Sequence, residues 1–338
     1  MKKVVTIGGG TGSFMLLSGL KEYPIELSAI VSMADDGGST GVLRDELGVL
    51  PPGDVRQCLV ALSDTPERLR ELMNYRFENG GLEGHSFGNL LLSALEKITG
   101  DFGDGVREAA QILNVRGEVI PVTLSDTRLY MELVDGRRLS GEDEINTDTK
   151  FERVGVKKVF LKPIPKANSL AVRRILDADL IVIGPGSHYC AIIPNLIVPG
   201  IAEALRKTRA KVVYNCNLVS KHGQTDRFAL EDYVDALHTL IGKPRIDFVT
   251  YNTSRPTERL LKKYAHEGSI VPFRQDDPKR RYRVIQTDLL SQEKVRRRRA
   301  DKIAHTRAFI RHDPKKLARV LMLLLEIGEY ENILNDIV

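Results

Sequence analysis

The N-terminal stretch constrains the fold most, because it places two glycine loops directly after two predicted strands. Residues 4–7 are apolar and run into Gly8-Gly9-Gly10-Thr11-Gly12, and a helix follows from about Ser13. A second predicted strand ends at Ser32 and leads to residues 35–41, which read DDGGSTG. Because open α/β sheets bind ligands outside the carboxyl ends of their strands, we predict that both loops face a ligand.

The first loop has the properties of an anion site. Its glycines let the backbone turn tightly and approach a ligand, and the helix that follows presents unpaired N–H groups and the positive end of its dipole. We therefore expect a phosphate or a nucleotide at Gly9, Gly10, Thr11 and Gly12. The alternative is a glycine-rich turn that binds nothing.

Two common phosphate loops fit this stretch poorly. A P-loop carries Lys followed by Ser or Thr after its second glycine, whereas Ser13 follows the first loop and Val42 the second. The dinucleotide fingerprint G-x-G-x-x-G matches Gly8 and Gly10 but meets Ser13 at its third glycine. Its acidic residue, expected about twenty positions later, would be Asp35. An NAD-dependent oxidoreductase is therefore the weakest hypothesis.

The second loop begins with two adjacent carboxylates, Asp35 and Asp36, and also contains Ser39. A ribose needs one acid, so a pair beside phosphate-binding amides suggests a metal such as Mg²⁺, a polar ring or a sugar hydroxyl. Arg44 and Arg56 flank the loop. Either could bind a phosphate in a bidentate manner, and either could equally form an ion pair with Asp35 or Asp36.

Length, composition and cysteine usage lead us to expect a cytoplasmic protein. The chain has 338 residues, 42% of them hydrophobic, without a long apolar run or a signal peptide, so we expect one large α/β domain over residues 1–338 and no transmembrane segment. Cys58, Cys190 and Cys216 match no zinc spacing and are expected to be reduced thiols. A nucleophilic role for Cys190 is the weaker alternative.

A basic segment at residues 275–305 contains the run Arg296–Arg299, which accounts for nearly all of the net charge of +5. Such a patch could touch nucleic acid or an anionic membrane. No aromatic stripe or helix-turn-helix accompanies it. We therefore favour a solvated loop or helix face and do not expect a nucleic-acid partner.

A third polar cluster is predicted at residues 84–92. Ser86 is a fitting helix cap and Asn89 lies one turn inside, so His85, Ser86 and Asn89 would gather at one helix N-terminus, where polar groups can meet a ligand. His85 could be a proton shuttle or only a histidine of the capping loop.

The middle of the chain predicts a β-rich insertion over residues 116–155 that covers the site. Strands are expected at residues 118–122 and 128–134, and Asp135-Gly136 is a strong hairpin signal. The α/β alternation then resumes with a strand at 157–161. Further expected elements are helices at 54–62, 66–77, 104–115, 169–176, 201–208, 230–240, 257–266 and 314–326, and strands at 179–183, 211–215, 246–251 and near 270.

Further candidates follow the later strands. The strand at 179–183 runs into Gly184, Gly186 and Ser187, a third turn able to bind an anion. Asn217 and Thr225 come after the strand at 211–215; turn chemistry alone explains them equally well. Asp313 caps the closing helix with Pro314 at its first position.

Arg311 would lie near the start of that closing helix, where it could reach a bound phosphate. The alternation of strands and helices predicts a three-layer α/β sandwich with a mainly parallel, Rossmann-like sheet and a small β insertion.

These motifs, in this order, resemble the YvcK or gluconeogenesis factor family within the CofD-like superfamily. The resemblance covers essentially the whole chain and rests on the glycine loop at 8–12, the segment 35–41, HSFGN at 85–89, GPGS at 184–187 and IRHD at 310–313. Two features depart from the family pattern. Pro314 stands where a Thr is common, which puts regulation through that hydroxyl in doubt, and the Arg-rich segment is longer than expected.

The resemblance implies a Rossmann-like nucleotide-binding half with a cleft at the strand ends. Similar proteins bind UDP-sugars such as UDP-N-acetylglucosamine and are linked to cell shape, cell-wall synthesis and growth on gluconeogenic carbon. By that likeness Gly10, Thr11 and Gly12 face a nucleotide phosphate, Asp35 and Asp36 face a polar acceptor or a metal, Asn89 lines the cleft, and Arg311 binds the uridine-sugar.

Two main hypotheses follow. The first is a regulatory module that binds a nucleotide sugar and passes its bound state to a partner protein. The second is a phospholactyl transferase that uses Mg²⁺ and moves a group from a guanosine-linked donor to a deazaflavin, by positioning and electrostatics. The sequence leaves open which sugar binds and whether the chain forms a homodimer.

Overall fold

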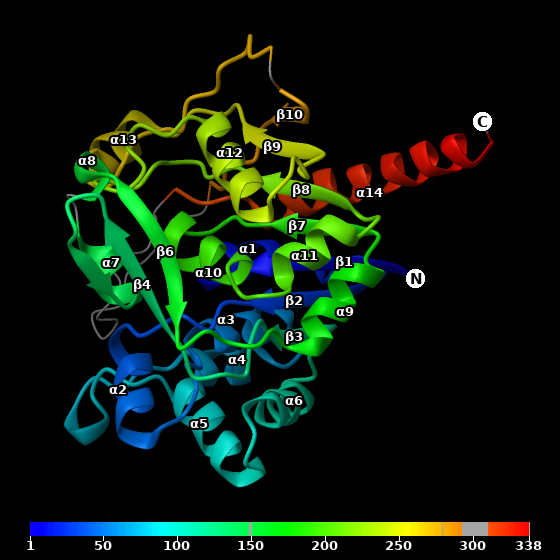
Figure 1. The fold of residues 1–338 in the computed structure, drawn as a ribbon. Helices are drawn as coiled ribbons and strands as arrows, with labels where there is room; N and C mark the ends of the chain where they lie inside the picture. The colour runs from blue at the N-terminus through cyan, green and yellow to red at the C-terminus, as the bar shows by residue number, and fades with distance from the viewer. Residues whose placement is uncertain (149–150, 279, 293–309, 338) are drawn as a thin grey trace.

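The computed structural model describes residues 1–148, 151–278, 280–292 and 310–337. Its centre is a seven-stranded sheet of order β10-β9-β8-β7-β1-β2-β3, in which each neighbouring pair is parallel (Figure 1). The strands are β1 (Lys2–Gly8), β2 (Ile25–Val31), β3 (Glu118–Pro121), β7 (Leu180–Ile183), β8 (Lys211–Asn215), β9 (Phe248–Asn252) and β10 (Arg283–Thr287). The predicted α/β fold class is confirmed.

The strand order reverses beside β1. The chain moves from β1 to β2 and β3 on one side of the sheet and then crosses to β7 on the other side. In open α/β sheets this switch point leaves a crevice at the carboxyl ends of the two diverging strands. Here those ends are the glycine loop after β1 and the turn that begins at Gly184 after β7.

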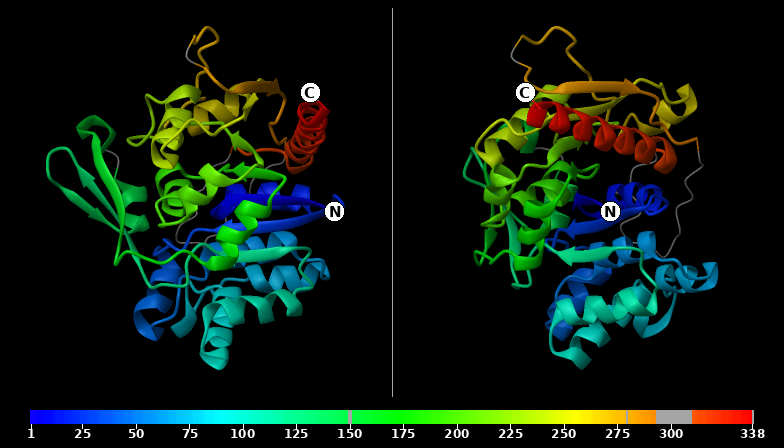
Figure 2. Two further views of the ribbon diagram at one scale, coloured as in Figure 1. Left: turned by 45° about the vertical axis from the view of Figure 1, so that its right-hand side comes forward. Right: turned by 90° about the vertical axis from the view of Figure 1, so that its right-hand side faces the viewer.

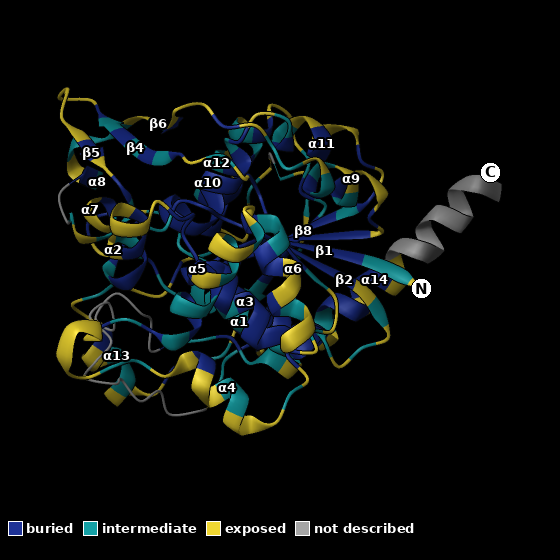
Figure 3. Cartoon of the chain, turned by 90° about the horizontal axis from the view of Figure 1, so that it is seen from below, coloured by how far each residue is buried: buried dark blue, intermediate teal, exposed yellow. Residues whose placement is uncertain are grey.

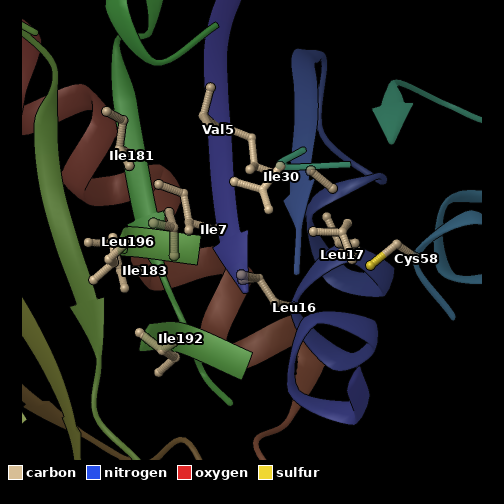
Figure 4. Close-up of a cluster of buried hydrophobic side chains, with 14 of the residues drawn as sticks. Val5, Ile7, Leu16, Leu17, Ile30, Cys58, Ile181, Ile183, Ile192 and Leu196 are labelled. Carbon is tan, nitrogen blue, oxygen red and sulfur yellow. The ribbon is translucent and has the colours of Figure 1, made fainter. Parts of the chain in front are cut away.

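The central strands are buried on both faces, which explains their continuous apolar sequences. Val4, Val5 and Ile7 in β1 are at most 1% exposed, and all of β7 is buried. Figure 4 shows Leu16 and Leu17 packed beside β1 and β2, and Leu196 beside β7.

Helices cover both faces and complete three layers (Figures 1 and 2). One face carries α9 (Ser169–Asp177), α10 (Ile193–Leu196), α11 (Ile201–Lys207) and α12 (Leu230–Ile241); the other carries α1 (Gly10–Leu20), α3 (Gly53–Leu62) and α14 (Pro314–Ile337). The remaining helices are α2 (Gly38–Leu47), α4 (Glu67–Asn74), α5 (Phe87–Thr99), α6 (Phe102–Ile112) and α13 (Glu258–Tyr264). Ser86 caps α5 and Asp313 caps α14 through their side-chain oxygens, as predicted.

A second, antiparallel sheet of order β5-β4-β6 lies at the end where the parallel strands finish (Figure 1). It consists of β4 (Arg128–Leu133), β5 (Arg138–Ser140) and β6 (Val156–Lys162), with the short helices α7 (Glu142–Thr147) and α8 (Phe151–Val154) between β5 and β6. The predicted hairpin turn is confirmed, because Gly136 has φ 88° and its N–H donates to Leu133. Alternate residues of β4 are fully buried, so one face of this sheet packs on the body (Figure 3).

The structure corrects several element assignments. β3, which the sequence grouped with the insertion, pairs with β2 in the large sheet, and β6, expected in the large sheet, pairs with β4. The antiparallel sheet therefore spans residues 128–162 rather than 116–155. The strand expected near 270 is only a bridge between Val219 and Ile270. Neither β10 nor α2 was predicted. β10 is an edge strand of mixed polarity, and the first residues of α2 were assigned to the second glycine loop.

Two further predictions concern the basic run and a transmembrane segment. The run Arg296–Arg299 lies outside the described residues. Within the described ranges, no single helix has the length and apolarity to cross a membrane, although the bent pair His188–Leu196 and Ile201–Lys207 passes that test jointly.

Candidate functional site

A cavity of about 610 Å³ lies at the carboxyl ends of β1, β7 and β8. Its wall combines the first glycine loop, the 185–187 turn, residues 217–222, part of the insertion, and residues 310–312 before α14. The sequence-predicted residues that line it are Gly9, Gly10, Thr11, Gly12, Asp35, Gly186, Ser187, Asn217 and Arg311. The structure thus brings Gly10 and Asp35 to one cavity.

The two glycine turns contact each other directly. A Cβ on Gly12 would lie 2.1 Å from the carbonyl oxygen of Pro185, so only glycine permits this approach. Gly10 adopts φ 63°, in the left-handed region that favours glycine. The loop prediction was therefore correct about backbone geometry, although α1 begins at Gly10, earlier than expected.

Three asparagine side chains hold carbonyl groups of these turns. Asn195 Nδ2 donates to Gly8 at 3.0 Å, Asn217 Nδ2 donates to Gly186 at 3.0 Å, and Asn215 Nδ2 donates to Gly184 at 3.1 Å. Gly184 itself does not line the cavity; it sets the turn with φ 71°. The turns are thus fixed by side chains of neighbouring elements.

Four acidic residues line the cavity: Asp35, Asp54, Glu142 and Glu267. Burial raises the pKa of Asp35, and hydrogen bonds from the Thr40 hydroxyl and the Gly37 N–H oppose that shift. Burial also raises the pKa of Glu142 well above its ordinary value, with Asp35 and Asp54 adding to the effect. Glu142 Oε2 is buried and has no hydrogen-bond partner within the described residues.

The sequence predicted a helix that begins at Asp54 and did not place Asp54 in the site. The helix α3 instead begins one residue earlier, at Gly53, so Asp54 lies in its first turn. Its carboxylate lies beside the first glycine loop, because a Cβ on Gly9 would come within 2.2 Å of Asp54 Oδ2. The sequence contained no signal for this approach, which depends on the packing of α3 against α1.

Asp36 does not line the cavity. Its carboxylate accepts a hydrogen bond from the Asp143 N–H at 2.9 Å, at the start of α7. A Cβ on Gly141 would come within 1.9 Å of Asp36 Oδ2, so the insertion packs tightly on this side chain. Burial raises the pKa of Asp36, and the N–H groups of Asp143 and Glu142 oppose that shift.

The predicted metal pair, Asp35 and Asp36, is therefore split between two surroundings, and Asp54 is one of the acids that share the cavity with Asp35. Among the described residues, no three His, Cys, Asp or Glu side chains are grouped closely enough to hold a metal ion. Mg²⁺ commonly uses one or two carboxylates and completes its shell with substrate phosphates and water. Asp35 and Asp54 could serve in that manner only together with a phosphate ligand.

Lys221 brings a positive charge to the same wall. Its ammonium donates a hydrogen bond to Asn146 Oδ1, and Cys190 Sγ lies 3.3 Å from that same oxygen. Burial lowers the pKa of Lys221. Burial, followed by the nearby Glu142, raises the pKa of Cys190, which keeps it a thiol and disfavours a nucleophilic role.

Several predicted site residues form a separate polar chain beside α5. Arg56 donates to Asn89 Oδ1 at 2.9 Å and to Asn74; Asn89 Nδ2 donates to Ser39 at 3.3 Å, and Ser39 pairs with His85 at 3.0 Å. The predicted gathering of His85, Ser86 and Asn89 at one helix start is present. None of these side chains lines the cavity.

Arg44 and Thr225 also lie away from the cavity lining. Arg44 is 5% exposed and binds Asp126 and the carbonyl of Thr127, on the connection that leads to the insertion. Thr225 Oγ1 accepts the Lys221 N–H at 2.9 Å and so shapes the 221–225 turn. Arg44 thus forms an ion pair, as one of the two alternatives predicted, but its partner is Asp126 rather than Asp35 or Asp36.

Known proteins match this chain over most of its length. The family model described as 2-phospho-L-lactate transferase CofD matches residues 4–290. A gluconeogenesis factor of Halalkalibacterium halodurans is 45% identical over 79% of this chain and 82% of its own length. That of Bacillus subtilis is 39% identical over 96% and 98% of the two chains.

The fold is similar to that of a solved structure. The crystal structure of a UPF0052 family protein from Bacillus halodurans superimposes with a TM-score of 0.85 at 38% identity. The match covers 95% of this chain and 98% of the other.

Proposed function

This chain belongs to the gluconeogenesis factor family, and from that premise we propose that it is a regulatory protein that binds a nucleotide sugar resembling UDP-N-acetylglucosamine. It would pass its bound state to a partner protein and so link gluconeogenic growth to cell shape and cell-wall synthesis. The observation that carries the proposal is the single cavity shared by two glycine turns, Asp35 and Arg311.

The charges around the cavity suit the separate parts of such a ligand. The glycine turns offer backbone N–H groups to a pyrophosphate, and the Arg311 guanidinium can neutralise its charge. Carboxylates accept hydrogen bonds from sugar hydroxyls, which suits Asp35, Asp54 and Glu142. We therefore assign these acids to the sugar and the glycine turns to the pyrophosphate.

The size of the cavity supports a ligand larger than phosphate. Its volume of about 610 Å³ falls in the range of roughly 300–1,000 Å³ typical of small-molecule sites. The polar residues that line it come from the β1, β7 and β8 ends, from the insertion and from the start of α14, so a ligand that spans them would contact all layers of the domain.

A phospholactyl transferase remains the second candidate, because the matched family model bears that description and Asp54 approaches the first glycine loop. In that function Asp35 and Asp54 would hold Mg²⁺ together with phosphate oxygens, and the metal would neutralise charge on the pyrophosphate. This chain's own residues would position donor and acceptor, since catalysis of this kind depends mainly on proximity and charge.

Thermal unfolding with a ligand panel separates the two. A ligand at about a hundred times its Kd adds roughly 2.7 kcal/mol to the free energy of unfolding, which raises the midpoint by a few degrees. We expect UDP-N-acetylglucosamine to raise the midpoint and to be recovered intact by chromatography. A shift only with GDP and Mg²⁺, together with consumption of a deazaflavin, would identify the transferase.

Arg311→Ala tests the residue assigned to the phosphate. It should abolish the UDP-N-acetylglucosamine shift and leave the ligand-free midpoint nearly unchanged. Arg319→Ala is the matched control, because Arg319 is an exposed residue of α14 and its loss should preserve the shift. A large drop of the ligand-free midpoint in Arg311→Ala alone would show that Arg311 serves the fold.

A further inference from the structure

One part of the cavity wall is apolar and belongs to a packing cluster separate from the main core. Leu218, Tyr264 and Ile310 form this cluster with Val219 packed against it, and all four line the cavity. Leu218 and Val219 come directly after Asn217, whose side chain is bound to the 184–187 turn. The wall therefore continues from the residue bound to the 184–187 turn to an apolar surface within three residues.

His312 stands in this wall with an unsatisfied nitrogen. It lines the cavity, is 5% exposed, and its Nε2 has no hydrogen-bond partner among the residues described. A hydrogen bond with the backbone of Cys216 raises the pKa of the His312 ring, so the Cys216 backbone acts as the acceptor. Because Nε2 has no partner among the described residues, the Cys216 carbonyl accepts this bond from Nδ1–H.

The ring is neutral at physiological pH. Burial lowers the pKa of His312 to about 4, and a neutral imidazole carries a single N–H. Since Nδ1 holds that hydrogen, Nε2 is an acceptor. No group of residues 1–148, 151–278, 280–292 or 310–337 bonds to it, and buried polar atoms without a partner are uncommon enough in folded proteins to require an explanation.

We propose that Leu218, Val219, Tyr264 and Ile310 enclose the nucleobase of the ligand, and that His312 Nε2 accepts a hydrogen bond from the N3–H of uracil. This inference rests on the proposed nucleotide-sugar function and specifies the base. Uracil offers a hydrogen at N3, whereas cytosine has a lone pair there. Two lone pairs that face each other repel, so His312 disfavours cytosine relative to uracil.

Asn217 supplies the connection between base and phosphate. Its Nδ2 is fixed on Gly186, which leaves Oδ1 as an acceptor, and that atom has no partner among the described residues. A ribose hydroxyl between the 184–187 turn and Leu218 would donate to it. The order phosphate, ribose and base then follows the chain from Ser187 and Asn217 to Val219 and His312.

The test compares UDP and CDP by isothermal titration calorimetry with the wild-type protein, His312→Phe and His312→Gln. An unpaired buried acceptor costs about 1–3 kcal/mol, so wild type should bind UDP roughly 5- to 150-fold more tightly than CDP. His312→Phe keeps a flat ring without the acceptor and should bring that ratio close to one. His312→Gln can turn its amide to offer either group and should bind both nucleotides.

His188→Phe is the control, because His188 is a buried histidine that does not line the cavity, and its ratio should equal that of wild type. Equal binding of UDP and CDP by wild type, or an unchanged ratio in both His312 variants, would overturn the role of His312 while UDP-sugar binding stands. Absence of binding by UDP and by UDP-N-acetylglucosamine would overturn the proposed function as well.

Discussion

The carboxylate of Asp36 accepts a hydrogen bond from the backbone N–H of Asp143, 2.9 Å away and 107 positions later in the chain. Asp36 follows β2 of the large sheet, and Asp143 lies in the first turn of α7 in the insertion. The other end of α7 is held by Gln224 Nε2, which donates to the Ile145 carbonyl at 2.8 Å. The cavity wall contributed by Glu142 and Asn146 therefore depends on anchors in both halves of the large sheet.

Replacing Asp36 with Ala should loosen this wall. The N–H groups at the start of α7 lose their acceptor, so we expect the free energy of unfolding to fall by about 1–3 kcal/mol and the amides of residues 141–148 to exchange faster with deuterium. Urea unfolding and hydrogen exchange measure the two effects. Asp45→Ala, which removes an exposed ion pair with Arg128, should cost less than about 1 kcal/mol. Equal exchange protection of α7 in wild type and Asp36→Ala would show that Asp36 does not anchor it.

Glu142→Gln should stabilise the ligand-free protein at pH 7. Burial and then the neighbouring acids raise the pKa of Glu142 well above 4.5, so the folded chain holds a proton that the unfolded chain has released. The free energy of unfolding therefore falls as pH rises through the raised pKa. The neutral amide removes this loss, and we expect the midpoint at pH 7 to rise by about 1–3 °C and the difference to vanish near pH 4. Glu108→Gln, an exposed change on α6, should do neither; a lower midpoint in Glu142→Gln at pH 7 contradicts the argument.

Gly12→Ala should separate the two glycine turns. Its Cβ would lie 2.1 Å from the Pro185 carbonyl oxygen, which belongs to the backbone and cannot rotate away. Overpacking of this kind costs about 1–3 kcal/mol, and we expect loss of the UDP-N-acetylglucosamine shift besides a lower midpoint. Gly81→Ala is the matched control, because a Cβ there meets nothing within 4 Å. Retention of full ligand affinity in Gly12→Ala would show that the contact between the turns is dispensable.

His188→Phe should reduce the sensitivity of the fold to acid. His188 contacts the rings of Tyr189, Phe228 and Tyr233, and burial lowers its pKa from 6.5 to about 4. The unfolded chain therefore binds a proton at pH 5 that the folded chain does not, which removes about 2 kcal/mol of stability between pH 7.5 and pH 5. Urea unfolding at both pH values should show a correspondingly smaller decrease in the variant. A decrease equal to that of wild type would exclude His188 as the source.

The features predicted correctly from the sequence are local in the chain. A strand, a glycine loop and a helix start lie within ten residues at Gly8 and again at Gly184, and the caps at Ser86 and Asp313 act on N–H groups two or three positions away. Such features depend on short-range backbone geometry, which residue type largely determines.

The features that could not be predicted from the sequence depend on contacts between elements that are distant in the chain. Asp54 reaches the cavity because α3 packs on α1, and Glu142 reaches it because Asp36 anchors α7. Arg44 and Arg56 were predicted beside the aspartates, and each lowers the pKa of one of them, but their hydrogen bonds to Asp126 and Asn89 come from distant parts of the chain. The sheet to which β3 and β6 belong was predicted wrongly, because the residue pattern of a strand does not determine which neighbouring strand it pairs with.

The asparagine contacts at the glycine turns also fix the direction of the next N–H group. In a planar trans peptide the carbonyl and the following N–H point to opposite sides, so the carbonyl of Gly8 held by Asn195 turns the Gly9 N–H the other way, and the carbonyl of Gly186 held by Asn217 does the same for Ser187. These two donors are thus oriented as the chain folds. If the proposed pyrophosphate binds there, both donors are already oriented, and little of the binding energy is consumed in rearranging the loops.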